Sequence, residues 1–204
     1  DKDHAIEGYK QLIFYCVQTY KTSQMSIYID KALNLAVECN YHKEIGILLR
    51  LKGLYKLMSK EYQEAESLLL ESINTFNITP YIADRYSLNI AAAYNYIGEI
   101  RRINKDFAQA IKYYKKAATI CKEKNAMISF AIFNVNAGQA SYDDGNVQDA
   151  KKYFETAHSI YDKLDTVWRK SVASAFLAVI YLKEKNYEKA LHLIKEAERD
   201  SQKI

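Results

Sequence analysis

The hydrophobic positions of this sequence recur with helical spacing along almost its whole length. In the segment 105–117, Ala110, Tyr114 and Ala117 follow one another at intervals of four and three, with lysines between them. This spacing puts the three side chains on one face of an α-helix. Patterns of this kind predict ten helices, with bounds uncertain by about two to four residues, at roughly 4–22, 25–40, 42–58, 61–77, 81–104, 106–124, 126–143, 147–163, 166–184 and 187–202.

The pattern is an internal repeat. Ala110, Ala150 and Ala190 stand at the same position of three copies spaced by 40 residues, and Ala65 stands there 45 residues before the first of them. Met25 holds the same place in a more divergent copy. Repetition at this length is typical of stacked helical units, in which each unit buries its apolar face against its neighbours.

A second position repeats with the first. In three of the copies a glycine lies 12 residues before the repeated alanine: Gly53, Gly98 and Gly138. A glycine inside a helix costs about 1 kcal/mol relative to alanine. Its recurrence at one phase predicts a close approach of the backbone of another helix.

Composition agrees with a chain of helices joined by short turns. The 204 residues include only 6 Gly and 1 Pro, which excludes a loop-rich enzyme, a turn-rich β-sandwich and a disordered chain. The 18 Tyr suit half-buried positions between helices, where the ring packs and the hydroxyl stays polar. The pairs Lys105-Asp106, Gly145-Asn146 and Lys185-Asn186 mark turns, with Asp or Asn available as the helix N-cap.

The spacing of small residue, alanine, large apolar residue and second small residue resembles the tetratricopeptide repeat. The resemblance implies an all-α fold, a right-handed superhelix (an α-solenoid) of about five antiparallel helix pairs. It covers residues 1–204 as a single array with repeats at about 4–40, 42–77, 81–124, 126–163 and 166–202. The period of 40 exceeds the family's usual value of about 34, and the family's helix-ending proline is absent. Longer helices of this kind are typical of bacterial regulators, including Rap-type peptide receptors.

The resemblance also implies a binding groove lined by the first helix of each pair. Amide side chains there can pair with both the N–H and the C=O groups of an extended peptide. In the alternative interpretation, Asn95 and Asn136 bridge neighbouring helices and are structural. The groove positions carried over from the family are Arg50, Leu54, Asn95, Glu99, Arg102, Asn136, Gln139 and Tyr142.

No pattern in the chain indicates catalysis. The four histidines fall in different repeats, and the segment Asp143-Asp144-Gly145-Asn146 lacks the ligand spacing of a calcium loop, so it is expected to be a turn. Phosphate-binding loops, nucleophile elbows and zinc-protease motifs are missing. We therefore expect no enzyme activity, no metal site and no cofactor. The three cysteines are expected to be reduced, mostly buried thiols.

Charge and hydropathy narrow the choice of partners. The net charge is +4 with the two signs interleaved, and Lys112, Lys115 and Lys116 alternate with apolar residues as on the solvated side of a helix. We expect no direct binding of nucleic acid by this segment. No run of 18 apolar residues exists, so we expect no membrane span, and no secretion signal is present. These features predict a cytoplasmic location.

The sequence thus favours a protein- or peptide-binding module, part of a larger bacterial cytoplasmic regulatory protein. The alternative is a self-assembly or scaffold element that works without a peptide ligand. The last predicted helix keeps Leu191, Leu193 and Ile194, more apolar residues than one buried stripe needs. This surplus suggests that a homodimer could form through an uncapped end.

Overall fold

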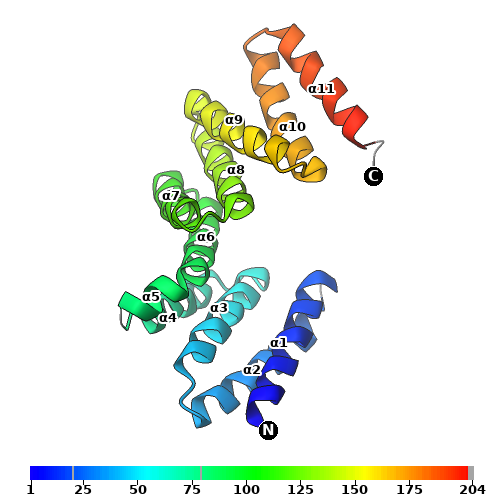
Figure 1. The fold of residues 1–204 in the computed structure, drawn as a ribbon. Helices are drawn as coiled ribbons and strands as arrows, with labels where there is room; N and C mark the ends of the chain where they lie inside the picture. The colour runs from blue at the N-terminus through cyan, green and yellow to red at the C-terminus, as the bar shows by residue number, and fades with distance from the viewer. Residues whose placement is uncertain (20, 79, 202–204) are drawn as a thin grey trace. The chain divides into compact units, whose positions relative to one another are not determined.

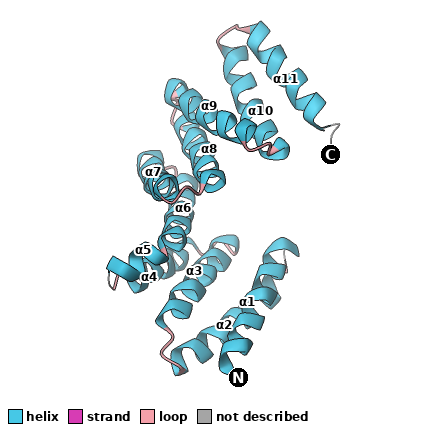
Figure 2. Ribbon diagram, in the orientation of Figure 1, coloured by secondary structure: helices cyan, strands magenta, loops and turns pink. Residues whose placement is uncertain are grey.

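The computed structural model describes residues 1–19, 21–78 and 80–201, which form eleven α-helices and no strand (Figure 2). The prediction of an all-α helical repeat is confirmed. The helices are α1 (Lys2–Thr19), α2 (Thr22–Glu38), α3 (His42–Met58), α4 (Tyr62–Phe76), α5 (Pro80–Arg85), α6 (Ser87–Ile103), α7 (Phe107–Glu123), α8 (Met127–Asp143), α9 (Val147–Lys163), α10 (Val167–Lys183) and α11 (Tyr187–Ser201).

The chain divides into two compact parts, an N-terminal half (residues 1–100) and a C-terminal half (residues 101–204), and α6 crosses the boundary. In the N-terminal half, α1, α2, α3 and α4 pack in sequence, each on the next (Figure 1). In the C-terminal half, α7 to α11 do the same. Each helix therefore contacts chiefly its neighbours in the sequence, as a repeat protein requires.

One type of turn joins most of the helices. At Lys105 the backbone is left-handed, and the N–H groups of Lys105 and Asp106 donate to the carbonyls of Arg102 and Arg101, both at 2.9 Å. This pair of bonds is a Schellman motif, which ends a helix and reverses the chain within three residues. The same left-handed position, with φ between 50° and 84°, recurs at Asn40, Lys60, Lys105, Asn125, Gly145, Asp165 and Lys185.

The residue after the left-handed position starts the next helix. The side-chain oxygens of Asp106, Asn146 and Asn186 each accept a hydrogen bond from the backbone N–H three residues on, at 3.2 or 3.3 Å. The predicted N-caps are therefore confirmed, and the segment around Gly145 is a turn as expected. Because one residue both completes the Schellman motif and caps the next helix, the connection stays short.

The repeated alanines are buried, as predicted. Ala65, Ala110 and Ala150 are 0% exposed, and Ala190 is 1% exposed. The predicted close approach at the glycine position is present, but side chains come closer than backbone. A Cβ atom added to Gly53 would lie 2.7 Å from Cγ of Leu69 and 3.2 Å from the backbone oxygen of Ala65. A Cβ atom added to Gly138 would lie 2.8 Å from Cε1 of Phe154, a side-chain atom rather than a backbone atom. The glycine is needed because a large side chain of the second helix fills the space above it.

The prediction of one helix over 81–104 was wrong. The structure has the short α5 and then α6, with Tyr86 between them. The Tyr86 ring stacks on Phe76 with centroids 5.3 Å apart, and its carbonyl accepts from the N–H groups of Asn89 and Ile90 at 2.8 and 3.1 Å. The residue that interrupts the helix is thus fixed by packing on α4 and begins the next helix. The first helix is also shifted, covering 2–19 rather than 4–22.

Several tyrosines lie at helix contacts, and some of them are more deeply buried than the half-buried positions that the composition suggested. Tyr114 and Tyr161 are buried, and Tyr181 is 8% exposed with its hydroxyl donating to Oε1 of Glu155 at 3.1 Å. Cys16 and Cys121 are buried free thiols, and burial raises the pKa of Cys121 to about 11. Among the described residues, no helix is both long and apolar enough to cross a membrane.

Candidate functional site

In the N-terminal half, two of the predicted groove residues lie on α3. Arg50 is half-buried, and its Nε donates to Oδ1 of Asn89 on α6 at 3.3 Å. Burial lowers the pKa of Arg50, although a hydrogen bond with the Tyr96 hydroxyl acts in the opposite direction. Leu54 is half-buried against the apolar core of this half. Arg50 therefore ties α3 to α6, and only part of its side chain remains available to a ligand.

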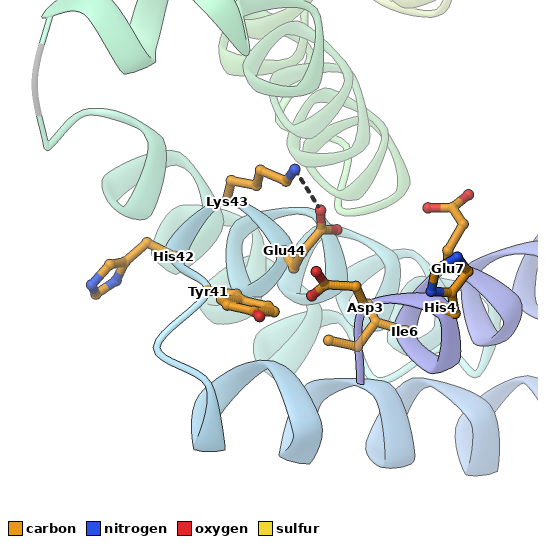
Figure 3. Close-up of a pocket in the computed structure, with 8 residues that line it drawn as sticks. All are labelled: Asp3, His4, Ile6, Glu7, Tyr41, His42, Lys43 and Glu44. Atoms are coloured by element: carbon orange, nitrogen blue, oxygen red, sulfur yellow. Dashed lines mark ion pairs between the residues drawn. The ribbon is translucent and has the colours of Figure 1, made fainter. Parts of the chain in front are cut away.

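A recess of about 650 Å³ opens between the starts of α1 and α3 (Figure 3). Sequence reasoning did not find it. Asp3 and Glu7 lie four residues apart and therefore share one face of α1. Lys43 lies seven residues, about two turns, before Arg50, so it continues the face of α3 that carries this predicted groove residue. The recess is lined by Asp3, His4, Ile6, Glu7, Tyr41, His42, Lys43 and Glu44.

Charged groups in and beside the recess are held by one another. The Lys10 ammonium lies 2.8 Å from Oε2 of Glu7 and 3.1 Å from Oε2 of Glu44, and Lys43 lies 3.3 Å from Oε1 of Glu44. Burial alone would lower the pKa of Lys10, but the hydrogen bonds to both carboxylates raise it above its ordinary value. Hydrogen bonds from Lys10 and Gln11 lower the pKa of Glu7. Lys10 and Glu7 therefore stay ionised at neutral pH.

The wall of the recess combines this charge with an aromatic ring. Figure 3 shows Tyr41 next to Asp3, while the His42 side chain points away from them. The hydrogen bond to the Asp3 carboxylate raises the pKa of the Tyr41 phenol. Glu44 is only 8% exposed, so its carboxylate forms part of the floor. The recess has the character of a site for a basic group beside an apolar surface.

In the C-terminal half, the predicted residues Asn136, Gln139 and Tyr142 follow one another at spacings of three along α8, and all three are half-buried. This spacing keeps them on neighbouring parts of one helix face. The Lys183 ammonium lies 4.5 Å from the centroid of the Tyr142 ring. Arg102 of α6 pairs with Asp143 of α8, Nη1 to Oδ2, at 3.2 Å. These residues form a second polar face, which carries amide, aromatic and ion-paired groups.

Two further predicted residues, Asn95 and Glu99, lie on α6 within the N-terminal half, and both are half-buried. The structure thus brings Arg50 close to α6 and places Asn136, Gln139 and Tyr142 together on α8. A continuous surface through all eight predicted residues stays a prediction. Within the described ranges, no three side chains of His, Cys, Asp or Glu converge as metal ligands would.

Comparison with solved structures identifies the fold. The chain is similar to BtubC (BKLC) from P. vanneervenii, with a TM-score of 0.80 and 15% sequence identity over 98% of this chain and 88% of that one. It is similar to a STAND protein with a tetratricopeptide repeat sensor from Pyrococcus horikoshii, with a TM-score of 0.79 and 20% identity over 99% of this chain and 31% of that one. It is also similar to a Rap protein complexed with competence and sporulation factor, with a TM-score of 0.77 and 16% identity over 97% of this chain and 54% of that one.

These likenesses confirm that the chain has a fold of the tetratricopeptide type. No protein-family model and no curated protein sequence matches it. At sequence identities of 14–20% to this chain, the similar structures establish its fold but not its function.

Proposed function

We propose that the chain is a binding module that takes a peptide or an extended segment of a protein on the faces of its first helices. The observation that carries this proposal is the recess between α1 and α3, because it combines volume, ionised groups and an aromatic wall on the expected face. Pockets of about 300–1,000 Å³ are the usual size for specific recognition of small groups.

The chemistry of the two faces suggests how such a segment is held. The Asp3 and Glu7 carboxylates suit a lysine or arginine side chain, or an N-terminal amine, with Tyr41 against its aliphatic part. The amides of Asn136 and Gln139 can donate to and accept from the backbone of an extended chain.

The similar structures are compatible with this role. One of them, a Rap protein, was solved in complex with competence and sporulation factor, and another carries its tetratricopeptide repeats as a sensor. By analogy of fold, we propose that this chain belongs to a bacterial cytoplasmic regulatory protein and serves as its ligand-sensing part. It has no catalytic role of its own in this proposal.

The test is selection of peptides from a random library on the immobilised chain, followed by titration of the enriched peptides. We expect peptides that bind the recess to carry a basic residue and to bind Glu7→Gln about tenfold more weakly. Peptides that bind the α8 face should bind Asn136→Ala about tenfold more weakly. Circular dichroism should show unchanged helicity in both variants. Gln148→Ala, an exposed change outside both faces, is the matched control. Equal binding by all variants, or no enrichment over an unrelated helical protein, would contradict the proposal.

One observation favours self-assembly as a second function. The large apolar residue four positions after the repeated alanine is 0% exposed in Leu69, Tyr114 and Phe154 but 43% exposed in Ile194. Leu191 beside it is 51% exposed, whereas Leu193 is buried. We propose that the exposed apolar face of α11 pairs with a second copy of the chain. Sedimentation of the chain and of Ile194→Lys at micromolar concentration tests this, because a monomer in both cases would exclude it.

A further inference from the structure

A second recess, of about 430 Å³, lies in the C-terminal half between α7 and α9 and above α8. The apolar part of its lining comes from Phe130, Phe133 and Ala137 of α8 and from Ala118 of α7. The remaining lining residues are Tyr114, Lys115, Thr119, Lys122, Glu123, Asn134 and Tyr153. We call this the α7–α9 recess.

At two positions the α7–α9 recess is lined by smaller residues than the next repeat has, although Phe133 is larger than its equivalent, Ala173. One repeat later, 40 residues on, a corresponding recess between α9 and α11 measures about 260 Å³. There His158 stands in the place of Ala118, and Leu177 stands in the place of Ala137. Both larger side chains line that recess and take up space that the two alanines leave open. The same backbone arrangement thus gives an open recess in one repeat and a smaller one in the next.

The charge at the rim also differs between the two recesses. Lys115 and Lys122 are exposed at the rim of the α7–α9 recess, and the Lys115 ammonium lies 5.9 Å from the centroid of the Tyr153 ring. One repeat later the equivalent residues are Glu155 and Asp162. Glu123 is also in the lining, so the rim carries two positive charges against one negative charge. A basic rim around an apolar floor complements an apolar side chain that is flanked by carboxylates.

The floor shows a third difference. Phe130 in the α7–α9 recess corresponds to Lys170 in the next repeat. The Lys170 ammonium lies 3.1 Å from Asp162, 3.1 Å from Glu196 and 2.8 Å from Asp200, so ion pairs occupy that place. In the α7–α9 recess the same place holds an aromatic ring, which offers apolar surface to a ligand.

Part of the predicted groove lies on the other side of α8 from the α7–α9 recess. Successive residues of an α-helix are rotated by about 100°, so Gln139 points about 120–180° away from the three α8 residues that give the recess its apolar lining. Asn136, by contrast, is only about 60° from Phe133. A ligand held at Gln139 therefore leaves this recess accessible.

We propose that the α7–α9 recess is a docking site for an acidic segment of a partner protein, which inserts one bulky apolar side chain between α7 and α9. The apolar side chain contacts Phe130, Phe133 and the two alanines. The flanking carboxylates pair with Lys115 and Lys122. Burial of one large apolar side chain supplies most of the affinity, and the two lysines select acidic neighbours and weaken as salt rises.

The experiment uses the whole chain and three fluorescein-labelled probe peptides. The first is rich in Glu and Asp with one central Phe, the second has Ala in place of that Phe, and the third has Lys in place of the acidic residues. We expect the first peptide to bind at least about tenfold more tightly than the other two by fluorescence anisotropy. Absence of saturable binding of the first peptide up to about 1 mM would overturn the proposal.

Variants locate the binding. Ala118→His introduces the residue of the next repeat and fills the recess, so we expect about tenfold weaker binding or more. Ala108→His, at an exposed position of the same helix, is the matched control and should bind as the unchanged chain does. Lys115→Glu reverses the rim charge and should reduce both the affinity and its dependence on salt.

Two results separate this proposal from that of the groove. Gln139→Ala should leave binding of the first peptide unchanged, because Gln139 points about 120–180° away from the α8 lining of the recess. Loss of binding in that variant would place the peptide on the other face and overturn the inference. The melting temperature of Ala118→His should stay within a few degrees of that of the unchanged chain. If Ala118→His does not fold, Lys115→Glu, which changes only an exposed side chain, decides: unchanged binding there would reject the site.

Discussion

Gly138→Ala sets two effects of similar size against each other. Alanine is the better helix former by about 1 kcal/mol, so propensity alone predicts a more stable protein. The new Cβ, however, would lie 2.8 Å from Cε1 of Phe154 and 3.0 Å from Cδ1 and Cζ of the same ring. Real Cβ atoms do not approach that closely, so the ring or the helix must move.

The Phe154 ring has little room to move. It is 0% exposed and stacks on Phe176 with centroids 4.7 Å apart and an angle of 4° between the ring planes. Adding a methyl group to a packed core of this kind costs about 1–3 kcal/mol. Subtracting the propensity gain of about 1 kcal/mol leaves a net loss of about 0–2 kcal/mol. For a protein of this size, 1 kcal/mol corresponds to a change of about 2–4 °C in melting temperature.

The control is Gly8→Ala on α1, where an added Cβ meets no atom within 4 Å. Propensity acts alone there, so we expect a gain of up to about 1 kcal/mol. Urea unfolding followed by circular dichroism compares the two variants. The equivalent positions of the next repeat hold Ala178 and the smaller Ile194. Gly138→Ala combined with Phe154→Leu should therefore recover part of the lost stability. A gain in Gly138→Ala equal to that of Gly8→Ala would refute the argument.

Three further predictions concern turns, cores and pH. Lys105→Gly should stabilise the chain by about 0.5–1 kcal/mol in urea unfolding, because φ is 60° there, whereas Lys112→Gly within α7 should destabilise it by about 1 kcal/mol. Phe154→Ala should cost about 3–5 kcal/mol, and Ile194→Ala, at the equivalent but 43% exposed position, should cost clearly less. Hydrogen bonding to Lys151 lowers the pKa of Glu184 below its ordinary value of 4.5. The ionised Glu184 therefore stabilises the folded chain above pH 4.5, and this stabilisation is lost as the pH falls through the pKa of the folded state. Glu184→Gln should therefore lower the free energy of unfolding at pH 7, and the variant should lose less stability on acidification than the unchanged chain does. Urea unfolding at pH 7 and at a pH below the folded pKa of Glu184 measures both effects.

The fold was predictable because its constraints are local and recur. Each repeat must place a small residue against a large one, as Gly138 does against Phe154, and each turn must cap the helix that follows, as Asn146 does. These requirements restrict residue type, so they leave a pattern in the sequence. The turn residues with left-handed backbone recur just as regularly, but only at Gly145 does the residue type indicate that conformation. Lysine, asparagine and aspartate fill the other six positions, so composition alone did not reveal them.

The break between α5 and α6 was not predictable from the same signals. Residues 81–104 contain no proline or glycine at the break, and their hydrophobic spacing is compatible with one long helix. The interruption depends on stacking of Tyr86 on Phe76, a contact across ten residues and a turn. A contact of that kind leaves no periodic signal. The recess between α1 and α3 was missed for the same reason, because Asp3 and Tyr41 are distant in the sequence and meet only after folding.

The binding faces are harder to predict than the core, because an exposed position is compatible with several roles. Arg50 fits a groove by its position, yet its guanidinium also bridges α3 to α6 through Asn89. A small residue in one repeat, at a position where the next repeat has a large one, is a more informative signal of a binding site. Ala118 and Ala137 stand where the next repeat has His158 and Leu177, and their small size leaves a recess that costs contact energy. The next repeat has a smaller recess, of about 260 Å³ against about 430 Å³ here. A ligand that occupies the larger space would add contacts that the two alanines do not make.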